Sequence, residues 1–296
     1  MVQPSRPWRP AGAAPAAPRT VPRLVGSAAV AEPPIPERRR AATSTLGREL
    51  LYTLRQAQNH LVRLPRAEPD ALLLLRAGRA CWLIDDADMM CVFYREAAAQ
   101  LQAEVEAHGR RTGTAPEFWR LALGALWMTA TYSDLPKEKN TDQGALRMLT
   151  YQILDVGQRL ALDAAQPLDR QAIELVRLRA AWYAGDAEVQ RLLTAAEQRA
   201  AAMDVNNRGL WTGERDQLTL AAIKSVTRER PERMAAALAQ LDEHLWANAT
   251  RPPTIMDLVD EELLALEAAA VKAGVRAGGL RTAPKRGARR ADVGGH

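Results

Sequence analysis

The sequence predicts an all-α fold of about ten helices, arranged as stacked antiparallel αα-hairpins. Along residues 45–275, apolar residues recur at the three- and four-residue spacing of amphipathic helices. The prolines in this range fall where that spacing breaks, as helix ends require. No segment alternates β-branched residues between turn signals. We therefore expect a single all-α domain over residues 45–275, with almost no strand.

The breaks in the apolar pattern divide this domain into ten expected helices. They cover residues 46–64, 70–84, 86–108, 117–133, 142–163, 168–184, 187–203, 214–228, 232–248 and 255–274. Helix 117–133 is apolar on most of its sides, which predicts a central position. Gly185 and Asp186 are expected to end one helix and cap the next. Thr254 and Asp257 predict a capping box at the start of the last helix.

The order of these helices leaves two architectures open. The helices pair at intervals of roughly 40 residues, which suits a row of stacked hairpins. The stretch Ala181–Glu188 resembles the turn of a tetratricopeptide repeat. The domain is therefore expected to be either an irregular α-α superhelical bundle or a helical-repeat, TPR-like solenoid.

The positive charge of the chain is concentrated at its two ends. The whole sequence carries a net charge of +5. Residues 1–48 contribute +6 and residues 276–296 contribute +5, which leaves −6 for residues 49–275. An acidic domain argues against an extensive nucleic-acid-binding face, because phosphate contacts need lysine and arginine. Whether the basic ends bind nucleic acid or lipid is open, but without a folded reader such binding carries no sequence specificity.

Both ends of the sequence are expected to be disordered tails. Residues 1–44 are rich in Ala, Pro and Arg, and residues 276–296 are basic and contain several glycines. Neither segment has the apolar periodicity needed to bury enough surface. This composition is typical of GC-rich, actinobacterial-type genes, and an incorrectly assigned translation start is an alternative explanation of residues 1–44.

The cysteine content and hydropathy indicate a cytoplasmic protein without a membrane span. The two cysteines, Cys81 and Cys91, cannot form a disulfide framework or a four-ligand zinc site, and we expect them to be small buried residues. No stretch approaches the roughly 20 apolar residues of a transmembrane helix.

Asp85, Asp86 and Asp88 form the sharpest acidic cluster of the sequence. Three carboxylates within four residues could hold Mg²⁺, so a magnesium-dependent enzyme is a remote alternative. Acidic residues also cap helix starts and oppose the helix dipole. Exposed acids can, in addition, attract a basic partner. We keep Asp85, Asp86 and Asp88 as candidate partner-binding residues, together with Trp211 in a loop rich in Asn and Gly.

The sequence contains no assembled catalytic motif. It lacks the glycine-rich phosphate-binding patterns, the serine-hydrolase elbow and the HExxH zinc motif. No catalytic, cofactor-binding or metal-ligating residue is therefore assigned, and no cofactor is expected.

Four blocks of sequence resemble one known family. The blocks are Ala77–Trp82, Phe118–Leu123, Met234–Leu238 with the following His244, and Leu263–Ala269. In their order and small-residue pattern they resemble the all-helical "immunity protein forty-nine" family of polymorphic-toxin systems, over about residues 65–275. The resemblance implies a protein that neutralises a toxin by covering it, and it supplies no catalytic residue. The two tails depart from the family layout.

These observations favour a non-enzymatic helical module for protein–protein interaction. Its most specific form is an immunity protein that binds a basic toxin, since an acidic domain steers a basic partner. A TPR-like regulatory or scaffolding protein is the alternative, with a peptide or helix bound in a concave groove.

Overall fold

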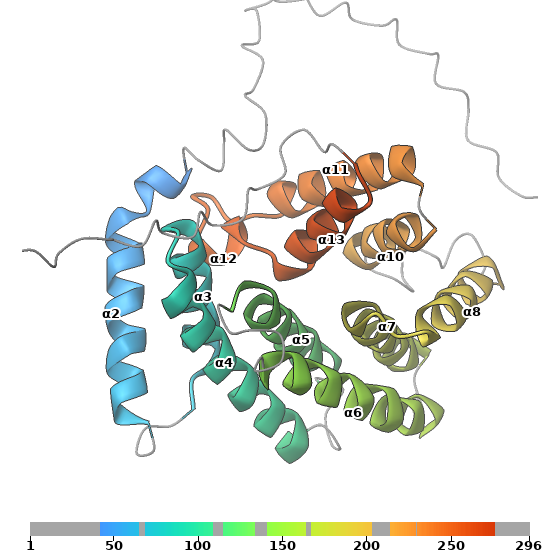
Figure 1. Ribbon diagram of the computed structural model, residues 1–296, viewed down its shortest axis with the longest axis horizontal. Coiled ribbons are helices and arrows are strands. Elements are labelled where there is room, and N and C mark those ends of the chain that lie inside the picture. The colour runs from blue at the N-terminus through green and yellow to red at the C-terminus, as the bar shows by residue number, and fades with distance from the viewer. Residues whose placement is uncertain are drawn as a thin grey trace, which may run out of the picture. The chain divides into compact units, whose positions relative to one another are not determined.

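The computed structural model describes residues 42–64, 69–108, 115–133, 141–163, 167–202, 214–228 and 230–275. These residues contain eleven labelled helices and no strand, which confirms the predicted all-α class (Figure 1). The helices are α2 (Gly47–Arg63), α3 (Ala71–Leu83), α4 (Ala87–His108), α5 (Ala115–Tyr132), α6 (Thr141–Asp163), α7 (Pro167–Ala184), α8 (Glu188–Ala202), α10 (Glu214–Thr227), α11 (Pro231–Ala247), α12 (Ile255–Leu258) and α13 (Glu261–Lys272). None of these helices is long and apolar enough to cross a membrane.

The first nine expected helices are present, with ends within two residues of those predicted. Residues 42–45 are also helical, so the described chain enters a helix slightly before the predicted end of the N-terminal tail at residue 44. Residues 1–41 and 276–296 lie outside the described residues.

The prediction of one continuous helix over residues 255–274 is wrong. The chain is extended at Val259 (φ −128°, ψ 126°) and Asp260 (φ −128°, ψ 115°), which separates α12 from α13. Asp260 caps α13, because its side chain accepts a hydrogen bond from the backbone N–H of Leu263 at 2.9 Å. Helix starts favour acidic residues, and Asp260 is followed by Glu261 and Glu262. The acidic run therefore begins a new helix and does not continue the old one.

The two predicted caps are confirmed. Gly185 has a φ of +67°, in the left-handed region that favours glycine at a helix end. The side chain of Asp186 then accepts a hydrogen bond from the N–H of Glu188 at 2.9 Å. Thr254 and Asp257 form the capping box of α12.

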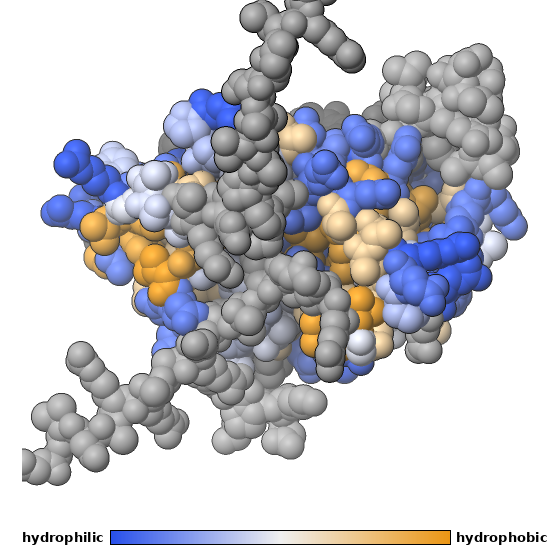
Figure 2. All heavy atoms as spheres, turned by 90° about the horizontal axis from the view of Figure 1, so that it is seen from above, coloured by the Kyte–Doolittle hydropathy of each residue, from blue (hydrophilic) through white to orange (hydrophobic). Residues whose placement is uncertain are grey.

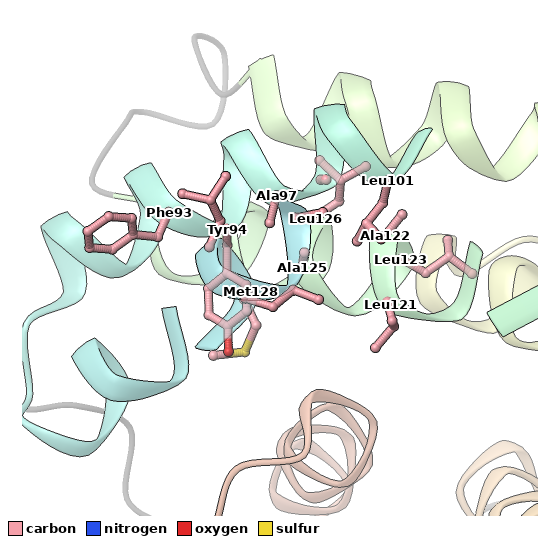
Figure 3. Close-up of a cluster of buried hydrophobic side chains, with 14 of the residues drawn as sticks. Phe93, Tyr94, Ala97, Leu101, Leu121, Ala122, Leu123, Ala125, Leu126 and Met128 are labelled. Carbon is pink, nitrogen blue, oxygen red and sulfur yellow. The ribbon is translucent and has the colours of Figure 1, made fainter. Parts of the chain in front are cut away.

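Helix α5 is central, as its apolar character predicted. It packs against α4, α6, α7 and α13. Figure 3 shows buried side chains of α4 and α5 together in the main core, where α4 contributes Phe93, Tyr94, Ala97 and Leu101. Both cysteines are buried, as expected.

The helices pack mostly as neighbours along the chain, but α13 does not. Successive contacts run from α2 to α8 and again from α10 to α11, while α13 returns to pack against α5, α10 and α11 (Figure 1). In a repeat solenoid each unit contacts only its neighbours. The contact between α13 and α5 is instead typical of an irregular bundle, and repeat character stays a prediction.

Close packing of α3 on α4 depends on a glycine. A Cβ atom built on Gly78 would lie 2.9 Å from a ring carbon of Tyr94. The ring cannot move away easily, because Tyr94 is fully buried and its hydroxyl donates a hydrogen bond to Glu261 at 2.8 Å. Only a residue without a side chain fits at this contact.

We predict that Gly78→Ala lowers the free energy of unfolding by about 1–3 kcal/mol, because overpacking forces Tyr94 or a helix to shift. The control is Gly144→Ala in α6, an exposed position where the new Cβ meets nothing within 4 Å. This control should stabilise the protein by up to about 1 kcal/mol through helix propensity. Urea unfolding measures both variants, and equal effects would contradict the prediction.

Candidate functional site

Asp85 and Asp86 form the turn between α3 and α4. Asp85 has a φ of +67°, a left-handed conformation that aspartate tolerates better than most residues. Asp86 caps α4, because its Oδ1 accepts a hydrogen bond from the N–H of Met89 at 3.1 Å. The N–H of Asp86 donates to the carbonyl of Cys81 at 2.9 Å. The helix-start interpretation therefore holds for Asp86, whose side chain is occupied.

Around this turn, exposed acids lie beside exposed apolar side chains. Asp85 and Asp88 are exposed, and so are Ile84 (47%) and Val92 (40%). Asp88 and Val92 are four residues apart in α4 and share one face of the helix. We call Ile84, Asp85, Asp88 and Val92 the corner surface.

Two further sequence predictions concern a magnesium site at the acidic cluster and a contact role for Trp211. Asp85, Asp86 and Asp88 are not gathered as a metal site: in the part of the chain that the structure describes, no group of three or more His, Cys, Asp or Glu side chains is placed to hold an ion. Trp211 lies outside the described residues.

The most densely charged site was not predicted. It lies at the start of α13, where Glu261 and Glu262 are 4% and 3% exposed. Burying carboxylates costs several kcal/mol unless each one is paired and hydrogen-bonded. We call these two residues, Asp260 and their arginine partners the carboxylate–arginine network.

Glu261 binds Arg79 of α3 through two parallel hydrogen bonds. Arg79 Nε donates to Oε1 and Nη2 donates to Oε2, both at 2.7 Å. The third nitrogen, Nη1, donates to the backbone carbonyl of Met256 at 2.7 Å. Through Arg79 and the hydroxyl of Tyr94, Glu261 thus links α13 to α3 and α4, while Arg79 also holds the backbone of α12.

Glu262 connects α13 to the helices on its other side. Arg179 of α7 donates from Nε to Glu262, and its Nη2 donates to Asp216 of α10 at 2.7 Å. Thr219 of α10 donates its hydroxyl to Glu262 at 3.3 Å. Arg215 Nη2 lies 2.7 Å from Asp260 Oδ2 and completes the network.

The network keeps Asp260 charged. Burial opposes ionisation of Asp260, but the charges of Arg215 and Arg120 and the hydrogen bond from Leu263 outweigh it, so the pKa of Asp260 lies well below its ordinary value. Burial and the charge of Glu261 raise the pKa of Tyr94 well above 10, which keeps its hydroxyl protonated and able to donate. The arrangement suits fixed ion pairs between helices.

A cavity of about 340 Å³ lies beside this network, between α5, α7 and α10. Three arginines line it, and each is already paired. Arg120 donates to Glu117 at 2.9 and 2.6 Å, while Arg179 and Arg215 bind the network acids. Because these charges satisfy one another, the cavity presents no strong preference for an anion or a cation.

Comparison with protein-family models, curated proteins and solved structures finds no match to this chain. The resemblance to the immunity protein forty-nine family therefore stays a prediction. Sequence reasoning missed the network because its pairs lie far apart in the chain, with Arg79 and Glu261 separated by 182 positions. The one local signal was the acidic run that starts at Asp260.

We predict that Arg179→Met lowers the free energy of unfolding by about 3–5 kcal/mol, because it leaves Glu262 buried without its strongest partner. The matched control is Arg159→Met, which removes an exposed ion pair with Asp155, where both side chains are more than 60% exposed. Such surface pairs contribute at most about 0.5 kcal/mol. Denaturant unfolding of the two variants would contradict the prediction if their losses were similar.

We also predict an acid dependence of stability that comes partly from Asp260. The pKa of Asp260 is lower in the folded state than in the unfolded state, where it is about 4. Its contribution to the free energy of unfolding is therefore complete above about pH 4 and is lost as the pH falls further. Asp260→Asn keeps a side chain that can cap α13 but removes the titration. Between pH 7 and pH 3 this variant should lose less unfolding free energy than the wild type, by more than about 1 kcal/mol. Urea unfolding at several pH values measures both proteins. If the free energy of unfolding fell equally with pH in the variant and the wild type, Asp260 would not be a source of the acid dependence.

Proposed function

We propose that this chain is a non-enzymatic protein–protein interaction module that binds a basic partner protein through the corner surface. The observation that carries the proposal is the composition of that surface. Two exposed apolar side chains, Ile84 and Val92, lie beside two exposed carboxylates, Asp85 and Asp88. Apolar contact gives affinity, while complementary charge at its edge gives specificity and speed of association.

The corner surface has a defined shape before any partner binds. The cap made by Asp86 and its backbone hydrogen bond to Cys81 hold the turn, and Cys81 itself is buried in the main core. A surface held in this way loses little conformational entropy on binding, which favours affinity.

The charge of the domain supports a basic partner. Residues 49–275 carry a net charge of −6, and a field of that sign increases the association rate of a positively charged protein at low salt. In its most specific form the partner is a toxin, and binding neutralises it by covering its active surface. The resemblance of four sequence blocks to an immunity-protein family supports this form, which requires contact and no reaction in this chain.

The test is co-expression with the protein encoded by the adjacent gene, followed by size-exclusion chromatography. We expect this chain to restore the growth of cells that express the toxin, and the two proteins to elute together as a stable complex. Asp88→Lys should reduce the association rate by roughly tenfold at low salt, because it reverses a charge at the contact. The control, Asp155→Lys, makes the same charge change at an exposed position of α6 and should reduce the rate much less.

Absence of both rescue and complex would overturn the toxin form of the proposal. A complex that Asp88→Lys and Asp155→Lys weaken equally would overturn the corner surface as the binding site. Circular dichroism of both variants checks that neither change unfolds the helices.

A further inference from the structure

A second, larger cavity opens between α2, α3 and the short helix α12. Its volume is about 690 Å³, within the range of small-molecule sites. The C-terminal half of α2 and the N-terminal half of α3 form its walls, and Met256 of α12 contributes to its lining. We call it the α2–α3 groove.

Two arginines of this groove lack the partners that the network arginines have. Arg63 of α2 and Arg76 of α3 both line the groove, and neither forms an ion pair or hydrogen bond within the described ranges. The acid in the lining is Asp70, whose Oδ1 caps α3 by accepting a hydrogen bond from Leu73 at 2.9 Å. The groove therefore has two guanidinium groups that can bind an added anion.

His60 also lines the groove, but its Nε2 atom is not open to a ligand. It lies on α2 in the groove lining, and its Nε2 atom is buried without a hydrogen-bond partner among the described residues. A buried polar atom that makes no hydrogen bond costs about 1–3 kcal/mol. Because this atom is closed to solvent, a ligand in the groove does not reach it, and the charge that attracts an anion comes from Arg63 and Arg76.

Apolar side chains complete the lining. Leu72 is 56% exposed, and Leu73 and Met256 also line the groove. The position of Met256 is fixed, because its carbonyl accepts the hydrogen bond from Arg79. Cations on two helices and an apolar wall are the features of a site for an organic anion.

We propose that the α2–α3 groove binds a small organic anion, with a phosphate or carboxylate group held by Arg63 and Arg76. The organic part lies against Leu72 and Met256. This site is separate from the corner surface, so it stands whether or not the proposed partner binding is correct.

The experiment is isothermal titration calorimetry of the full chain at constant ionic strength. Phenyl phosphate, benzoate and inorganic phosphate are the three probes. We expect saturable binding of phenyl phosphate or benzoate, and the stronger of the two identifies the anionic group. Inorganic phosphate should bind more weakly than phenyl phosphate, because it makes no contact with the apolar wall.

Three variants decide whether the groove is the site. Arg63→Gln and Arg76→Gln should each weaken binding by about tenfold, because each removes charge-assisted hydrogen bonds to the anion. The control is Arg55→Gln, an exposed arginine of α2 that does not line the groove. It should change the affinity by less than about twofold.

Two results would overturn the proposal. One is the absence of saturable heat with both aromatic anions at millimolar concentration. The other is an equal loss of affinity in all three variants, which would indicate nonspecific attraction to the protein's positive charges. Circular dichroism of each variant separates loss of the site from loss of the fold.

Discussion

Two adjacent buried carboxylates determine how the two halves of this bundle meet. Successive residues of a helix point about 100° apart, so Glu261 and Glu262 face different neighbours. Glu261 binds α3 and α4 through Arg79 and Tyr94, while Glu262 binds α7 and α10 through Arg179 and Thr219. Helix α13 makes both sets of contacts from its first two residues, directly after the break that Asp260 caps. The break places both carboxylates at the start of a helix, where the helix dipole favours negative charge.

The sequence predicted the helices well because helix formation is governed by local patterns. Apolar spacing, prolines and caps lie within a few residues of one another, as at Gly185 and Asp186. The partners of a buried charge are not local. Arg79 stands in an apolar helix, and its sequence neighbours contain nothing to show that it binds a residue near the other end of the domain. The predicted continuous helix over residues 255–274 failed for a different reason, because the apolar spacing was followed past a local helix-start signal, the acidic run that begins at Asp260.

The acidic cluster at the turn between α3 and α4 also shows how far sequence patterns can predict the roles of single residues. Asp85, Asp86 and Asp88 are the same residue type within four positions, yet the structure gives them different roles. Asp86 caps α4 and is half-buried, whereas Asp85 occupies a left-handed position and Asp88 is exposed on the helix. Sequence reasoning identified the cluster correctly as a helix start. It could not separate the side chain that holds the turn from the two that remain available to a partner.

The pairing of buried carboxylates with arginines also explains how an acidic domain can contain a basic groove. Four carboxylates, those of Asp216, Asp260, Glu261 and Glu262, are bound to arginines of the network, so their charge is largely cancelled where it lies. The charges that determine binding are those left without partners. Arg76 lies near the middle of α3, and Asp85 lies just past its end. Nine residues of helix rise about 13 Å, which is more than the Debye length of about 8 Å at physiological salt. Salt therefore weakens the interaction between the charges of the two surfaces, and the net charge of the domain describes neither surface.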